Sequence, residues 1–380
     1  MKYTICNTIH IIMYTYIQQI SNKITIKKEE EMADVEGKTK EMDEEEVDAD
    51  GWPKSLQHRK DGSCRSWLAV LGAALAQFVA VGSFYTIGMF VVPFMNAFDC
   101  GRGLAAATGS FSAIGFLTWS PFAGRFGDRY GSRRAILIGG STATFFYFLA
   151  SFSESIYAIW ILYGIGVGFG CSTMYAPSAA IPANWFVKKR GLATGLAVAG
   201  GALGNVIFPL ILSPILTSFG WAWALRIMGI LTLVSCILSY FLIERRFPLI
   251  TDGSPVIKLD LGLLKKRPGL LRLALTYGAF QFGFFAPLLH LPAYTELDAG
   301  GTGLGLPASA TVLSFMGLGN FIGRFALGVL ADKAGPIATG TFANVMVAIA
   351  TFFWPMYNDL AILSAYGFFY GLFGSAFWSL

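Results

Sequence analysis

One arginine stands inside a long apolar stretch of this sequence, where a charge is costly to bury. Arg324 lies in the run Gly319–Phe325, and Asn320 precedes it by about one helical turn. The planar guanidinium of an arginine can hold a carboxylate through two parallel hydrogen bonds. Arg324 is therefore the first candidate for binding an anion, with Asn320 beside it. The alternative is that Arg324 reaches the edge of the stretch and pairs with Asp332 or Asp128.

Three further polar side chains within apolar stretches are candidates for a solute site. Tyr85 and Asn205 could line a cavity, although Asn205 fits helix packing equally well. His290 could relay protons because an imidazole titrates near neutral pH, and the alternative is a purely structural role near the end of its segment. The five cysteines are scattered, which indicates neither a disulfide framework nor a zinc site, and no cofactor is expected. The apolar stretches hold no converging His, Glu or Asp set, so we do not expect an enzyme.

Composition predicts the elements that carry these residues. Hydrophobic residues make up 54% of the 380-residue chain and charged residues 13%, whereas soluble domains carry about 25% charged residues. A membrane span needs about 20 apolar residues, and continuous apolar runs of that length should be helical in lipid. The sequence therefore predicts an all-α membrane protein. Ten spans are expected, at roughly residues 67–94, 104–124, 135–153, 157–181, 192–216, 221–243, 269–293, 306–328, 337–355 and 360–380.

Basic residues fall on one set of the intervening loops. Eighteen Lys and Arg residues lie in the N-terminal flank and in the loops after the even-numbered spans, whereas Arg102 alone lies in the opposite set. Because basic loops stay in the cytosol, this bias predicts a cytosolic N-terminus and a cytosolic loop at 244–268. The bias also explains the net charge of +5, so nucleic acid is not expected as a partner.

The N-terminal residues have a different composition. Residues 29–50 are strongly acidic and almost without aromatic residues, which is typical of a disordered, solvated tail. Residues 1–31 belong either to an upstream start or to a short genuine extension. The predicted organisation is an acidic cytosolic tail at 1–60, a six-helix bundle at 61–243, a cytosolic linker at 244–268, and a second bundle at 269–380 with four helices present.

The chain also repeats a loop motif, G-x-x-x-D-(R/K)-x-G, at an interval of 204 residues. Its residues are Gly124, Asp128, Arg129 and Gly131, with Arg133 following, and then Gly328, Asp332 and Gly335. Two parallel six-helix repeats joined by a long loop are typical of transporters. Copies of spans five and six would fall at about 396–447, so the second repeat is expected to be truncated after ten spans.

The stretch at 124–134, GRFGDRYGSRR, resembles the loop signature of the major facilitator superfamily between its second and third helices. The resemblance implies the major facilitator fold and a gating brace between helices, in which Asp128 accepts hydrogen bonds or pairs with an arginine. A plain basic loop that sets topology is the alternative.

Two further stretches are similar to monocarboxylate-porter-like proteins, in the form seen in fungal members. They are the entry to helix five at Trp185–Gly200 and the Asp-Gly pair before Trp67. In this resemblance Arg324 matches a helix-eight arginine that handles carboxylates, but Asn320 stands where an aspartate is expected. The helix-one lysine of animal members is also missing from 82–90. Both departures put simple proton–lactate cotransport in doubt and fit a different or bulkier solute.

Together these features predict a secondary active transporter of a small organic anion, a monocarboxylate or a related solute. It would work by alternating access and draw on an ion or proton gradient, because the sequence holds no GxxxxGK[ST] nucleotide loop. The expected location is the plasma membrane, with the vacuolar membrane as the alternative. A non-transporting membrane receptor and, less favoured, a membrane-embedded enzyme are the alternative functions.

Overall fold

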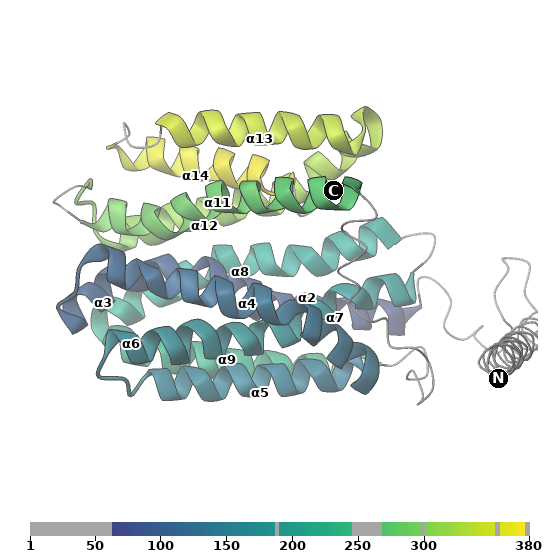
Figure 1. The fold of residues 1–380 in the computed structure, drawn as a ribbon, viewed down its shortest axis with the longest axis horizontal. Helices are drawn as coiled ribbons and strands as arrows, with labels where there is room; N and C mark the ends of the chain where they lie inside the picture. The colour runs from purple at the N-terminus through teal and green to yellow at the C-terminus, as the bar shows by residue number, and fades with distance from the viewer. Residues whose placement is uncertain (1–62, 187–189, 245–267, 298–300, 354–357, 377–380) are drawn as a thin grey trace, which may run out of the picture. The chain divides into compact units, whose positions relative to one another are not determined.

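The computed structural model describes residues 63–186, 190–244, 268–297, 301–353 and 358–376. Within these ranges every regular element is a helix, as expected for an all-α membrane protein. Each of the ten predicted spans coincides with a described helical segment (Figure 1). The predicted tail at 1–60 and most of the predicted linker at 244–268 lie outside the described residues.

The described residues up to 244 form six helical segments, two of which consist of several consecutive elements. Two of the predicted spans are irregular: the first changes to a 3-10 turn after Thr86, and the fourth contains a π-helical stretch. The elements are α2 (Cys64–Tyr85), η2 (Ile87–Phe90), α3 (Val91–Phe98), α4 (Arg102–Tyr130), α5 (Ser132–Ala150), α6 (Ile156–Ile159), η3 (Trp160–Val167), α7 (Gly168–Trp185), α8 (Arg190–Ser218) and α9 (Gly220–Leu242).

Four helices follow among the described residues from 268 onward, and their starts reproduce the sequence repeat. They are α11 (Pro268–Glu296), α12 (Leu306–Ala334), α13 (Pro336–Phe353) and α14 (Leu360–Gly374). Each begins 204 residues after its counterpart, namely α2, α4, α5 and α6. The turns between α4 and α5 and between α12 and α13 also match, because Gly131 and Gly335 adopt φ of 90° and 88°. The internal repeat predicted from the loop motif is therefore confirmed by the helix boundaries.

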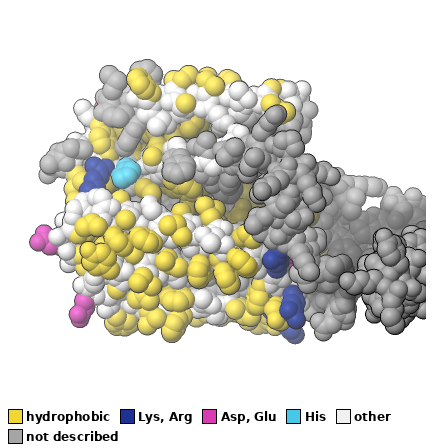
Figure 2. Space-filling model, viewed as in Figure 1, with side chains coloured by type: hydrophobic (Ala, Val, Ile, Leu, Met, Phe, Trp, Pro, Cys, Tyr) yellow, Lys and Arg dark blue, Asp and Glu magenta, His cyan; other side chains and the backbone are white. Residues whose placement is uncertain are grey.

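By length and composition, five of the described helices could each cross a membrane. Hydrophobic side chains also lie on the outer surface (Figure 2). Among the large ones, Phe152, Phe219 and Phe241 are each more than 65% exposed. A soluble protein rarely exposes so much contiguous apolar surface, whereas lipid would solvate it. Both observations fit an integral membrane protein.

Small residues set the closest helix contacts. Gly200 and Gly204 of α8 lie against the backbone of α2, so that a side chain on either glycine would collide with Ala74 or Phe78. Gly319 and Gly371 bring α12 and α14 together in the same way. Close backbone approach of this kind is the usual means of packing helices in lipid.

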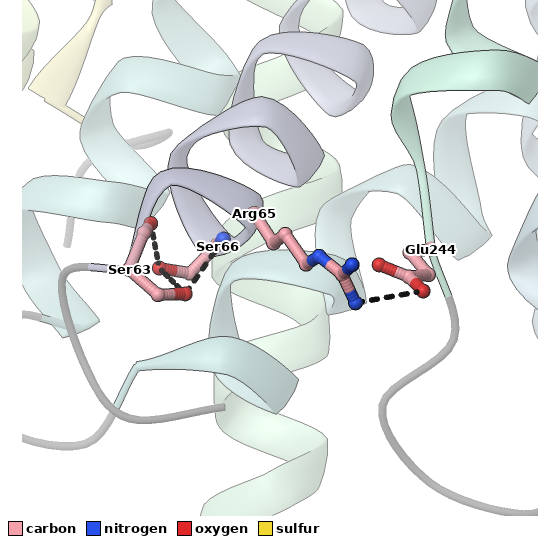
Figure 3. Close-up of polar contacts among 4 residues, drawn as sticks. All are labelled: Ser63, Arg65, Ser66 and Glu244. Carbon is pink, nitrogen blue, oxygen red and sulfur yellow. Dashed lines mark hydrogen bonds and ion pairs between the residues drawn. The ribbon is translucent and has the colours of Figure 1, made fainter. Parts of the chain in front are cut away.

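The start of α2 is capped and tied to the end of α9. The Ser63 hydroxyl accepts a hydrogen bond from the backbone N–H of Ser66 at 3.2 Å, and Arg65 pairs with Glu244 at 3.4 Å (Figure 3). The cap satisfies one of the open N–H groups of the helix. The ion pair is largely exposed and contributes little stability, but it shows that the first and sixth helical segments meet at this end.

Candidate functional site

Arg324 is buried between helices from both parts of the chain, with 6% of its surface exposed. Its Nε donates a hydrogen bond to Oδ1 of Asn320 at 2.9 Å, one turn earlier on α12. Its Nη1 donates to the backbone carbonyl of Val198 on α8. Asn320 is itself 2% exposed, so this pair holds the guanidinium in one orientation. The two residues that the sequence placed together therefore interact directly.

Two tyrosines face the same guanidinium. Tyr85, the last residue of α2, and Tyr175 of α7 both lie close enough to interact electrostatically with Arg324. Four helices thus converge on one charge: α2, α7, α8 and α12. Tyr85 was predicted as a site residue, whereas Tyr175 was not, since it is one of 15 tyrosines and nothing in its local sequence marks it.

Among the residues that the structure describes, Arg324 has no carboxylate partner. A guanidinium offers five N–H donors, and the bonds to Asn320 and Val198 use two of them. The remaining donors suit the two oxygens of a carboxylate. Asn320 orients the guanidinium but, being neutral, does not compensate its charge.

Asn205 and His290 lie apart from this group. Asn205 on α8 is 1% exposed, and its backbone packs against Gly317 of α12. His290 is half-buried near the end of α11, where its backbone carbonyl accepts a hydrogen bond from Arg102 at 3.1 Å. Arg324 lies 18 residues after the start of α12, about 27 Å along that helix. His290 lies near the C-terminal end of α11, which is joined to the start of α12, so it is distant from Arg324.

The contact around His290 is a second meeting point of the two parts of the chain. Gly88 of η2 lies against α11, since a Cβ there would stand 2.7 Å from the carbonyl oxygen of Leu288. Gly109 of α4 likewise leaves room for the side chain of Leu289. The contact between the two parts of the chain around His290 thus depends on Gly88, on Gly109 and on the hydrogen bond from Arg102.

A series of aromatic rings passes close to Arg324, and each ring contacts the next. Its members are Tyr175, Phe116, Phe84, Phe285, Phe284 and Tyr370. The step from Phe84 on α2 to Phe285 on α11 crosses between the two parts of the chain, with ring centroids 5.2 Å apart. Tyr85 also approaches Phe284, at 6.3 Å. The aromatic series therefore borders the charged group.

The residues predicted to form a gating brace lie at the ends of α4 and α12. Asp128 is exposed and has no hydrogen bond or ion pair with another described residue. Arg133 instead lies over the ring of Tyr240, 4.0 Å from its centroid, and Arg129 lies over Tyr130. The side chain of Asp332 is outside the described part of the structure. The brace stays a prediction.

The remaining motif residues are glycines with different surroundings. Gly124 and Gly328 have open space around them, whereas Gly131 and Gly335 make the turns described above. No group of three or more His, Cys, Asp or Glu side chains that could hold a metal occurs within the described ranges.

Comparisons with known proteins place these features in a family. Residues 73–380 match the model of the Major Facilitator Superfamily. Over 297 residues the chain is 30% identical to "MFS-type transporter 1" of Ophiocordyceps sp., covering 77% of this chain and 64% of that protein. It is 28% identical over 316 residues to the aspyridones efflux protein apdF of Emericella nidulans, covering 82% of this chain and 63% of that protein. The chain thus spans slightly less than two thirds of the length of these relatives.

Two other likenesses are more distant. Monocarboxylate transporter 14 of Mus musculus is 28% identical over 172 residues, which is 45% of this chain and 34% of that protein. A partially occluded, inward-open structure of the xylose transporter XylE from E. coli has a TM-score of 0.62 at 14% identity, covering 82% of this chain and 85% of that one. The structural likeness shows a shared fold.

Proposed function

We propose that this chain, which belongs to the Major Facilitator Superfamily, is a secondary transporter of a small organic anion. The family match over residues 73–380 establishes membership. One observation carries the choice of an anion: Arg324 is buried where four helices meet and faces hydroxyl and amide groups without a described carboxylate.

The cost of burying a charge supports this choice. Removing a guanidinium from water costs several kcal/mol unless an opposite charge or several hydrogen bonds compensate. Here Asn320 and the carbonyl of Val198 supply part of that compensation. A carboxylate on the solute would supply the rest, and bidentate binding would fix its orientation. The names of the relatives, an efflux protein and a monocarboxylate transporter, are consistent with an organic solute.

Alternating access would operate on this site in the following way. We propose that residues 61–243 and 269–380 act as two bundles joined by the cytosolic linker at 244–268, with the N-terminal tail also in the cytosol. When the bundles rock, α12 moves against α8, on which it packs, and against Tyr85 and Tyr175, so the contacts of Arg324 change between states. The motif residues Asp128 and Asp332 would brace the cytosolic ends. An ion or proton gradient would drive the cycle in the plasma membrane or, alternatively, the vacuolar membrane.

The test is uptake of radiolabelled organic anions into sealed vesicles that contain the protein. Arg324→Ala is expected to abolish uptake while membrane delivery stays normal. Arg324→Lys is expected to be impaired as well, because a point charge lacks the planar fork.

Arg226 provides a matched control for that experiment. It bonds the Ser151 hydroxyl at 3.1 Å and lies over the rings of Phe152 and Trp223, away from the site. Arg226→Ala removes the same charge and should retain uptake. Normal uptake by either Arg324 variant would contradict anion binding at this position. Labelling of a tag before Lys54 from outside intact cells would contradict the proposed orientation.

A further inference from the structure

We infer that the transported anion carries an aromatic or planar conjugated group, and that this group is held between Phe84 of α2 and Phe285 of α11. The inference rests on the proposed function, since it assumes that Arg324 binds the carboxylate. The inference specifies the chemical class of the part of the solute outside the carboxylate, which a single arginine does not determine.

The ring pair is connected to the surroundings of Arg324 through Tyr85. Phe84 precedes Tyr85, which interacts electrostatically with Arg324. Phe285 follows Phe284, whose ring contacts that of Tyr85 at 6.3 Å. On α2 the ring of Phe84 is therefore adjacent in sequence to the polar Tyr85, and on α11 the ring of Phe285 is adjacent to Phe284, which contacts Tyr85. A solute with a ring close to its carboxylate would reach both.

The Phe84–Phe285 contact also has to change during transport. The two rings meet nearly edge to face, at 82° and 5.2 Å, and they belong to opposite parts of the chain. If those parts separate around the site, each ring loses its partner. An aromatic solute restores edge-to-face or stacked contacts with both rings, whereas a short aliphatic anion leaves them unfilled.

The other neighbours of the pair are aromatic too. Phe84 contacts Phe116 at 5.6 Å, and Phe285 contacts Phe284 at 5.7 Å. Phe84 and Phe285 are both only partly buried, so neither residue is fully covered by other described residues. The neighbours of the pair are therefore mostly π-systems, which favour flat partners over branched aliphatic ones.

The experiment compares two probes that share one head group. Phenylpyruvate and pyruvate both carry a 2-keto carboxylate, and they differ only by the phenyl ring. Equilibrium binding of each radiolabelled probe is measured on the purified protein. We expect phenylpyruvate to bind about three- to tenfold more tightly, the ratio that one or two aromatic contacts provide. Phe285→Leu and Phe84→Leu should each reduce the ratio toward one while leaving pyruvate binding almost unchanged.

Phe111→Leu is the matched control. Phe111 stacks on Trp160 at 4.9 Å, outside the aromatic series, so its loss should leave the ratio intact. Equal binding of the two probes by the unaltered protein would overturn the inference and leave anion transport standing. A ratio that survives both Phe84→Leu and Phe285→Leu would overturn it as well. If neither probe binds and Arg324→Ala changes nothing, the proposed function itself fails.

Discussion

The helices α4 and α12 occupy equivalent places in the two repeats, yet they carry different chemistry. Both contain 29 residues, and both end at a glycine with φ near 90°. Gly115 on α4 and Gly319 on α12, 204 residues apart, each lie against a backbone carbonyl of the helix that packs on them. The residues that follow diverge: Phe116 and Ser120 on α4 correspond to Asn320 and Arg324 on α12.

This difference separates the scaffold from the site. Glycines at helix contacts and turns recur because both copies must bring backbones together and reverse direction in the same way. The charge occurs once because a single anion needs one guanidinium, and a second buried charge would only add desolvation cost. In the first copy Ser120 stands at the position equivalent to Arg324, and Phe116, a member of the aromatic series, stands at the position equivalent to Asn320. The two repeats thus contribute a ring surface and a charge to one site.

The largest expected effect tests the shared scaffold. Gly115→Leu and Gly319→Leu should both prevent folding, because a Cβ at Gly115 would already lie 2.7 Å from the carbonyl oxygen of Ile165. Overpacking typically costs about 1–3 kcal/mol, and here rigid backbone opposes the added side chain, so the cost should exceed that range. Size-exclusion profiles of tagged protein in detergent should lose the monodisperse peak for both variants. A normal profile for only one of them would show that the two contacts are not equivalent.

The next effect concerns the charge that only α12 carries. Asn320→Asp places a carboxylate where Asn320 accepts the hydrogen bond from Nε of Arg324. The new charge would compete with an anion for the guanidinium, because two unit charges at about 4 Å attract by about 4 kcal/mol at an effective dielectric constant near 20. We expect anion affinity to fall at least tenfold, on the order of 1.4 kcal/mol or more, in equilibrium binding.

Asn320→Ala is the companion variant. It removes the orienting contact without adding a charge, so its loss of affinity should be smaller than that of Asn320→Asp. An unchanged or higher affinity in Asn320→Asp would show that Arg324 does not bind the anion directly.

A moderate effect should again be equal in the two repeats. Gly131→Ala and Gly335→Ala each force a side chain into a backbone conformation with φ near 90°. The expected loss is about 1–2 kcal/mol each, which thermal denaturation in detergent would register as a lower midpoint. Gly124→Ala is the control, because Gly124 lies inside α4 with open space around it and should show no loss. Clearly unequal losses at Gly131 and Gly335 would contradict the matching turns.

The smallest effect distinguishes the copies once more. Arg133 lies over the ring of Tyr240 at 4.0 Å, whereas the equivalent position in the second repeat is Ile337, which is 85% exposed. Arg133→Gln should cost about 0.5–1 kcal/mol through the lost cation–π contact. A double-mutant cycle with Tyr240→Leu measures the coupling. Additive effects of the two changes would mean that the contact contributes no stability.

The sequence alone was sufficient for the helices and for the repeat. Apolar runs long enough to cross a bilayer are expected to be helical, because lipid cannot hydrogen-bond to unpaired backbone N–H and C=O groups. The interval of 204 residues between the loop motifs also separates the helix starts. Each motif ends in a glycine, Gly131 or Gly335, that makes the same turn between two helices. Arg324 was recognisable as well, since a charge within an apolar run is exceptional wherever the run packs.

Only the tertiary structure decided which groups surround that charge. The carbonyl of Val198 and the side chain of Tyr175 come from helices distant in sequence, and their approach to Arg324 depends on how α7, α8 and α12 pack. The same packing placed His290 beside Arg102, at the other end of α12 from Arg324. The local sequence pattern indicates which face of a helix is apolar. The side-chain partners across helices depend instead on the distance and angle at which the helices meet. Glycines more than 100 residues apart in the sequence set that geometry.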